Sequence, residues 1–350
     1  MNQKSIFSNG LLFKSTHIRL LLAIIFTMLV FFISLGWGKY SITANEFVGI
    51  LKKLFAGGSK INTNSSAFSV FYFIRLPRII LAMMVGSALS ATGCVFQGMF
   101  RNPLVSPDIL GVSAGCCFGA ALAILCSTGT YLSVSLLAFI FGFIAMGFAY
   151  GIGQVASGDK VLMLILGGIA VSAFFNAALS FLKYIADPFK TLPAIVFWVM
   201  GGFFRANWHY VYHLSIFIIP GLILLYLLSW KVNILSLGEE EASALGINMN
   251  RLRLVLTIIG TFLVAASVSF AGTVCWIGLV IPHIARLLVG PNHRLTIPMS
   301  AILGAGFTLL VDDFARNITT CEIPISILTA ALGAPFFVYL LIKGRGKVWN

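Results

Sequence analysis

The chain has 350 residues, of which 59% are hydrophobic and 9% are charged. Because a soluble domain carries roughly 25% charged residues, this composition excludes a water-soluble globule, and the long hydrophobic runs exclude a disordered chain. The net charge of +13 does not indicate nucleic-acid binding, since the basic residues lie singly or in pairs between hydrophobic runs. We therefore predict a protein embedded in membrane lipid, with no nucleic-acid partner, in which Lys and Arg mark the topology.

Hydrophobic runs divided by charges, prolines and polar clusters predict an all-α, polytopic membrane protein with about ten transmembrane helices. We expect one domain over residues 1–350. The predicted spans are residues 18–38, 77–99, 108–127, 132–155, 161–183, 211–230, 253–271, 274–289, 297–311 and 323–342. An even number places both termini on one side, and the bias of Lys and Arg in the short connections predicts that this side is the cytoplasm.

Three connections are longer than tight turns. Residues 39–76 contain a capped amphipathic helix at 43–54, and residues 184–210 contain an aromatic run typical of an interfacial helix. On the cytoplasmic side, residues 231–252 carry three consecutive carboxylates, where a helix start favours acidic residues. A solvated connector is the simple interpretation of this third segment. We favour a docking helix for another protein, because its exposed face mixes acidic with small hydrophobic side chains.

Sequence motifs for catalysis are absent. The chain has no GxxxxGK[ST] phosphate loop, no HExxH and no paired-cysteine metal site, so we predict neither an enzyme nor a metal-binding protein. The predicted spans contain no Asp, Glu, Lys or Arg away from their ends, whereas ion-coupled carriers bury such residues near the midplane. An ion-coupled secondary carrier remains the alternative class, followed by a membrane-embedded scaffold or enzyme.

A series of short motifs in a fixed order resembles a FecCD-like permease, the transmembrane subunit of ATP-binding-cassette (ABC) importers for metal chelates such as siderophores, haem and cobalamin. The resemblance covers residues 75–343. Its motifs are RLPR at 75–78, NPL at 102–104, LGVSAG at 110–115, WVMG at 198–201, LGE at 237–239, ALG at 244–246, IGLVIPHIAR at 277–286 and LGAPFF at 332–337.

The resemblance implies a homodimer in the cell inner membrane with its pathway on the two-fold axis. It implies two cytoplasmic ATPase subunits, which bind ATP and Mg, and a periplasmic or lipid-anchored substrate-binding protein; this chain would bind no cofactor of its own. The expected cargo is an iron-siderophore complex, with cobalamin, haem and molybdate as alternatives.

The resemblance also implies four groups of functional residues. The ATPase would contact a coupling element of Gly238, Glu239, Glu240, Glu241, Ala244, Leu245 and Gly246. The binding protein would dock on Arg75, Arg78 and Arg316, whose planar guanidinium groups suit carboxylates; ordinary residues at helix ends are the alternative. The pathway would include Gly167, Gly168, Ser172, Asn176, Ser326, Thr329, Gly333 and Pro335, although such small residues also serve helix packing. An inner gate would involve Asp159, Lys160, Val161 and Leu162.

Overall fold

Each long hydrophobic run of the sequence forms a helix in the computed structural model, which describes residues 3–40, 43–55, 66–126, 131–155 and 159–343. The helices are α1 (Gln3–Gly36), α2 (Ala44–Phe55), α3 (Ser66–Ser69), the π-helix η1 (Val70–Arg75), α4 (Leu76–Met99), the 3₁₀ turn η2 (Pro107–Leu110), α5 (Val112–Leu125), α6 (Tyr131–Val155), α7 (Lys160–Ile185), α8 (Thr191–Met200), α9 (Trp208–Leu227), α10 (Ser229–Leu237), α11 (Glu239–Ala244), α12 (Met249–Ala271), α13 (Ile277–Val289), α14 (His293–Asn317) and α15 (Ile325–Lys343). The all-α fold predicted from the sequence is confirmed.

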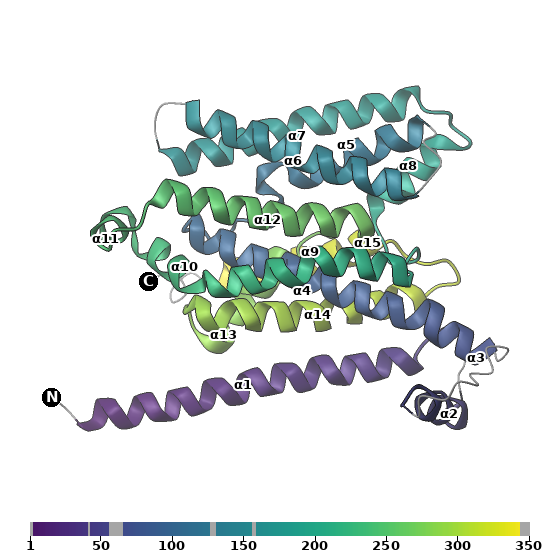
Figure 1. Ribbon diagram of the computed structural model, residues 1–350, viewed down its shortest axis with the longest axis horizontal. Helices are drawn as coiled ribbons and strands as arrows, with labels where there is room; N and C mark the ends of the chain where they lie inside the picture. The colour runs from purple at the N-terminus through teal and green to yellow at the C-terminus, as the bar shows by residue number, and fades with distance from the viewer. Residues whose placement is uncertain (1–2, 41–42, 56–65, 127–130, 156–158, 344–350) are drawn as a thin grey trace.

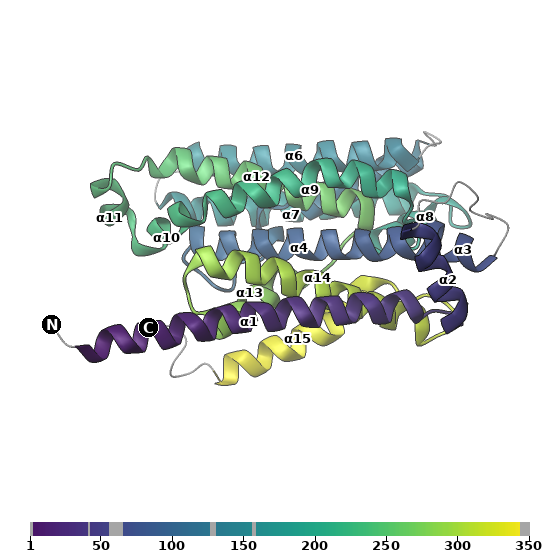
Figure 2. The same ribbon diagram turned by 60° about the horizontal axis from the view of Figure 1, so that its bottom comes forward.

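The helices lie side by side and run roughly parallel to the long axis of the molecule (Figure 1). One end carries α10, α11 and the start of α1, and we call it the α11 end; the opposite end carries α2 and α3, and we call it the α2 end. Helix α4 lies at the centre, packed on α9, α12, α13 and α14. Helices α5, α6 and α7 pack together on one side, and α1 lies on the other against α14 (Figure 2).

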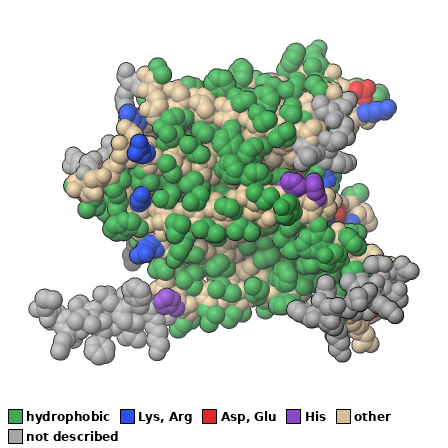
Figure 3. Space-filling view, in the orientation of Figure 1, with side chains coloured by type: hydrophobic (Ala, Val, Ile, Leu, Met, Phe, Trp, Pro, Cys, Tyr) green, Lys and Arg blue, Asp and Glu red, His purple; other side chains and the backbone are tan. Residues whose placement is uncertain are grey.

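The outer surface of this bundle is suited to lipid. Within the described residues, seven helices are long and hydrophobic enough to cross a membrane, and α5, α8, α13 and α15 are shorter hydrophobic helices. Large hydrophobic side chains such as Phe174 and Phe181 are more than half exposed, and such side chains cover most of the face in Figure 3. A hydrophobic exposed surface of this extent is typical of a protein embedded in lipid.

Close backbone contacts explain the glycines of α4. A Cβ atom on Gly93 would collide with the carbonyl group of Gly278 in α13, and one on Gly86 would collide with the carbonyl oxygen of Gly304 in α14. Small residues allow helices to approach closely where water provides no hydrophobic driving force. The central helix is therefore held by shape rather than by large side chains.

Helices α5 and α13 are shorter than the predicted spans 108–127 and 274–289, because each begins after a backbone reversal. Gly111, which precedes α5, has φ 77°, and Trp276, which precedes α13, has φ 67°. The turn η2 before α5 packs inside the bundle, where a Cβ on Gly168 of α7 would collide with the carbonyl oxygen of Ile109. Both helices therefore start within the bundle and not at its surface.

Helix α14 is longer than predicted. The sequence placed its end at residue 311, before a cluster of charged residues, but the helix continues to Asn317. Asp312, Asp313 and Arg316 are buried in this last part and form ion pairs within the chain. The charges thus belong to the packed end of the helix.

The long connections 39–76 and 184–210 contain the helices expected of them. In α2, the side chain of Glu46 accepts hydrogen bonds from the backbone N–H of Thr43 (2.9 Å) and from its hydroxyl (2.8 Å), which is the predicted cap. The hydrophobic helix α8 is followed by Gly201, whose φ of 71° turns the chain. A Cβ on Gly201 would collide with the carbonyl oxygen of Thr273, so this turn packs against the end of α12.

Candidate functional site

The predicted coupling element forms a short helix at the α11 end. Gly238 has φ 145° and separates α10 from α11, and Gly246 has φ 73° and ends the segment. Ala242 is fully buried and its carbonyl accepts a hydrogen bond from the Ile247 N–H (3.1 Å), so α11 is folded onto the start of α12. Leu245 is 59% exposed. The arrangement presents a hydrophobic side chain outward from a rigid turn.

Two further residues of this element lie at the surface. Ala244 and Glu241 are exposed, whereas the side chains of Glu239 and Glu240 lie outside the described part of the structure. Leu237, which ends α10, is also exposed, at 61%. Two exposed leucines on either side of a six-residue helix form a small apolar projection at the end of the bundle.

The predicted gate region lies beside this element. Asp159 caps α7 by accepting a hydrogen bond from the Val161 N–H (2.8 Å). Asp159, Lys160 and Val161 line a pocket of about 910 Å³, and the facing wall is the segment from Ile247 to Asn250 that follows α11. Leu162 is half exposed and is not part of this lining. The structure therefore brings the predicted gate region together with a segment about 90 positions later in the sequence.

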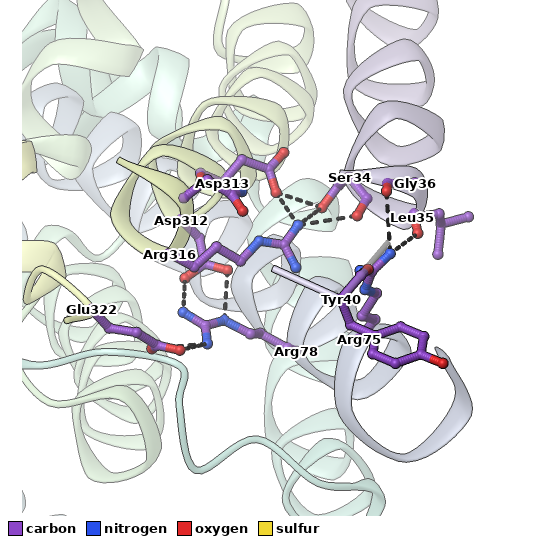
Figure 4. Close-up of polar contacts among 11 residues, drawn as sticks. Ser34, Leu35, Gly36, Tyr40, Arg75, Arg78, Asp312, Asp313, Arg316 and Glu322 are labelled. Atoms are coloured by element: carbon purple, nitrogen blue, oxygen red, sulfur yellow. Dashed lines mark hydrogen bonds and ion pairs between the residues drawn. The ribbon is translucent and has the colours of Figure 1, made fainter. Parts of the chain in front are cut away.

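The three predicted docking arginines lie together at the α2 end, where Figure 4 shows them pointing into the protein. Arg78 donates two hydrogen bonds to Asp312, from Nε to Oδ2 (2.9 Å) and from Nη2 to Oδ1 (2.8 Å). Its third nitrogen, Nη1, reaches both oxygens of Glu322 at 3.0 and 2.9 Å. All of its guanidinium nitrogens are thus engaged by carboxylates of the same chain.

The other two arginines bind to the end of α1. Arg316 pairs with Asp313 and donates to the carbonyl oxygen (3.0 Å) and the hydroxyl (2.7 Å) of Ser34. Arg75 donates from Nη1 to the carbonyl oxygens of Leu35 (2.9 Å) and Gly36 (3.2 Å). These contacts satisfy carbonyl groups that the last turn of α1 leaves without helical partners.

This network changes the interpretation of the arginines. Arg75, Arg78 and Arg316 are 3%, 7% and 6% exposed, so they do not present free guanidinium groups to a partner at this end of the bundle. Their contacts join α1, η1, α4 and α14, which is a structural role. The carboxylates of Asp312, Asp313 and Glu322 are the counter-ions of Arg78 and Arg316.

The predicted pathway residues divide into packing residues and exposed residues. Gly167 and Gly168 of α7 face α6 and η2, and a Cβ on Gly333 of α15 would collide with Trp276. Ser172 and Ser326 donate to the carbonyl oxygens of Gly168 (2.8 Å) and Met200 (2.6 Å).

The other three pathway residues differ in exposure. Thr329 is buried and donates to the carbonyl oxygen of Ser326 (3.2 Å), whereas Asn176 and Pro335 are exposed. Asn176 and Pro335 therefore remain candidates for a pathway surface, while the glycines are explained by helix packing.

A polytopic helical bundle with a hydrophobic outer surface defines an integral membrane protein. The FecCD transport family matches residues 25–343, and the chain belongs to this family. It is a multi-pass inner-membrane protein, the permease subunit of an ABC importer of the metal-chelate type, and it is not itself an enzyme, since the ATPase is a separate subunit.

Individual relatives agree with this assignment. The chain is 43% identical over 315 residues to the molybdate import system permease protein MolB of Haemophilus influenzae, covering 89% of this chain and 91% of MolB. It is 35% identical over 342 residues to the iron(3+)-hydroxamate import system permease protein FhuG of Bacillus subtilis, covering 95% and 99%. A metal-chelate type ABC transporter solved in an inward-facing conformation superposes with a TM-score of 0.80 at 38% identity, covering 94% of this chain and all of that one.

Proposed function

We propose that ATP-driven closure of a partner ATPase moves α11 and thereby the start of α7. The observation that supports this is the shared pocket: the segment Ile247 to Asn250, which continues directly from α11, faces Asp159 and Lys160 across it. A rigid displacement of α11 changes the distance between these two walls of the pocket. This is expected of a gate that opens and closes through rigid-body movement of a packed helix. The α11 end is then the cytoplasmic end, and both termini lie on the cytoplasmic side.

The assembly around this mechanism is also part of the proposal. Two copies of the chain form a homodimer around the pathway, two ATPase subunits bind at the α11 ends, and a periplasmic or lipid-anchored binding protein delivers the cargo at the α2 ends. ATP and Mg bind to the ATPase, and the permease contributes no cofactor. The family membership and the exposed leucines of the α11 end support this arrangement.

The coupling role is tested by replacing Leu245 with Asp. A charge at the centre of a small apolar contact removes most of its binding free energy, so we expect the ATPase to be lost on co-purification and transport to fall at least about tenfold. Phe189→Asp is the control, because Phe189 is 88% exposed and lies in the loop before α8. Retention of the ATPase by Leu245→Asp would refute the assignment of α11.

For the cargo, the 43% identity to a molybdate permease moves molybdate ahead of the iron-siderophore complex as the first candidate. The iron(3+)-hydroxamate relative supports the iron-siderophore complex as the second. Both are metal-containing solutes. The test is uptake by proteoliposomes that contain the permease, its ATPase and its binding protein, supplied either with radioactive molybdate or with a radioactive ferric hydroxamate. Accumulation of the ferric complex alone would reject molybdate.

A further inference from the structure

The pocket at the α11 end is built from three helix termini that are distant in sequence. The end of α4, the start of α7 and the start of α12 surround a volume of about 910 Å³. Met99, Phe100 and Met249 are buried and line it, so part of its wall is apolar and fixed by the core. A pocket of this size lies within the range of small-molecule sites in proteins, roughly 300–1,000 Å³.

Basic side chains dominate the rest of the lining. Arg101, Lys160 and Arg253 contribute three positive charges, and Asp159 contributes the one carboxylate among the lining residues. One oxygen of that carboxylate already accepts the Val161 N–H. The lining therefore carries a net positive charge next to an apolar wall, where Coulomb interactions are stronger than in bulk water.

Two helix starts add to this potential. Helix α7 begins at Lys160 and α12 begins at Met249, and both residues line the pocket. The first N–H groups of a helix and its macrodipole favour an anion at this end. The N-cap side chains Asp159 and Asn248 each accept a single N–H, so other N–H groups in these first turns have no helical carbonyl to bind.

The backbone conformation of Arg101 is a separate indication that this pocket has a function. Arg101 has φ 50°, in the left-handed region that a residue with a Cβ atom rarely occupies because its Cβ approaches the following carbonyl oxygen. The turn is held by hydrogen bonds from the Arg101 N–H to the Gly98 carbonyl (3.3 Å) and from the Asn102 N–H to the Gln97 carbonyl (3.1 Å). Glycine would suit this position, yet an arginine occupies it and lines the pocket. Strained positions of this kind concentrate at functional sites.

The surroundings lie where protein meets the membrane surface. Val155 at the end of α6 is 87% exposed and Leu162 at the start of α7 is 49% exposed, and Figure 3 shows Lys and Arg side chains gathered at this end of the hydrophobic face. We propose that the pocket is a binding site for a phosphate-type oxyanion, either a free tetrahedral anion such as phosphate or molybdate, or the phosphate of an anionic lipid headgroup. Asp159, Lys160 and Val161 of the predicted gate region line the same pocket, so the site lies at the gate of the proposed mechanism and rests on that proposal for its place in the transporter.

The test measures binding to the purified full-length permease and does not require transport. In one arm, inorganic phosphate and sodium molybdate are titrated into the protein in zwitterionic detergent and followed by calorimetry. In the other arm, native mass spectrometry counts phosphatidylglycerol retained from nanodiscs that contain it with phosphatidylcholine. Binding in the first arm identifies a free anion, and selective retention in the second arm identifies a lipid. The absence of binding in both arms would overturn the proposal.

Matched variants locate the binding. Arg101→Gly removes one charge at a position whose φ suits glycine, so the fold is retained, and Lys160→Gln removes a second. Each should weaken binding roughly tenfold, because hydrogen bonds to charged groups are the stronger ones. Arg294→Gln, which alters an exposed basic residue at the start of α14 outside the pocket, should have no effect. Equal loss in Arg294→Gln, or unchanged binding in both pocket variants, would show that the anion binds elsewhere.

Discussion

Arg78 in α4 holds the carboxylate of Asp312 in α14 through two parallel hydrogen bonds of 2.9 and 2.8 Å, across 234 positions of sequence. Both side chains are buried, with 8% and 1% of their surface exposed. A buried pair of this kind is costly to break because the remaining charge keeps no partner. Its geometry therefore fixes how the ends of two central helices meet.

We expect Arg78→Ala to destabilise the permease by about 3–5 kcal/mol, the usual cost of leaving a buried charge without its partner. The double variant Arg78→Met with Asp312→Leu should recover much of this loss, since replacing both partners by apolar groups is often neutral. The midpoint of thermal unfolding in detergent measures both effects. A wild-type midpoint for Arg78→Ala would contradict the ion pair.

The structural role of the arginines can be separated from docking of a binding protein. We expect Arg75→Glu to lower the unfolding midpoint of the permease alone, because the change places a carboxylate against the carbonyl oxygens of Leu35 and Gly36. Lys190→Glu is the control, since it makes the same change of charge at an exposed residue directly before α8. If Arg75→Glu left stability unchanged and abolished only the stimulation of ATP hydrolysis by the binding protein, docking would be its function.

Helix packing at the centre of the bundle predicts a clear contrast between two glycines. Gly93→Ala should destabilise the protein by about 1–3 kcal/mol, the usual cost of overpacking, because the added methyl group collides with Gly278. Gly147→Ala in α6 meets no atom within 4 Å and should be neutral or stabilising by up to about 1 kcal/mol through helix propensity. Thermal unfolding of the two variants under the same conditions distinguishes these outcomes.

The cap of α2 predicts a pH dependence. Hydrogen bonds from the backbone and the hydroxyl of Thr43 lower the pKa of Glu46 below its ordinary value of 4.5. The stabilisation of α2 by the ionised Glu46 carboxylate is therefore complete above pH 4.5. It is lost as the pH falls through the lowered pKa of Glu46. In Thr43→Ala, the Glu46 pKa should rise toward 4.5, as measured by carbon NMR of labelled glutamate. An unchanged pKa would show that the hydroxyl does not contribute.

The helical bundle could be predicted because its signals are local. Runs of hydrophobic residues, a Thr and a Glu three positions apart, and a glycine on each side of α11 carry their information within a few residues, and α2 and α11 form where they were expected. The prediction was wrong where the deciding partner is distant. Asp312 ended the predicted span because a lone carboxylate is costly in lipid, and only the fold brings Arg78 to it.

Among the functional residues, too, local segments could be predicted from the sequence, whereas contacts between distant segments could not. The coupling element and the gate region were predicted as separate segments, and the pocket between the gate region and the segment Ile247 to Asn250 depends on how α7 and α12 pack. Arg101 carried no signal in the sequence, because a positive φ at a non-glycine residue is visible only in three dimensions.

The internal starts of α5 and α13 have a consequence for how the protein enters the bilayer. These helices contain 14 and 13 residues, which rise only about 20 Å and fall short of the roughly 30 Å of hydrocarbon. The irregular backbone before each of them has carbonyl and N–H groups that lipid cannot satisfy. Neither helix is therefore expected to insert alone during synthesis: α5 needs α6 and α7, and α13 needs α4 and α14, which are the helices that pack against them.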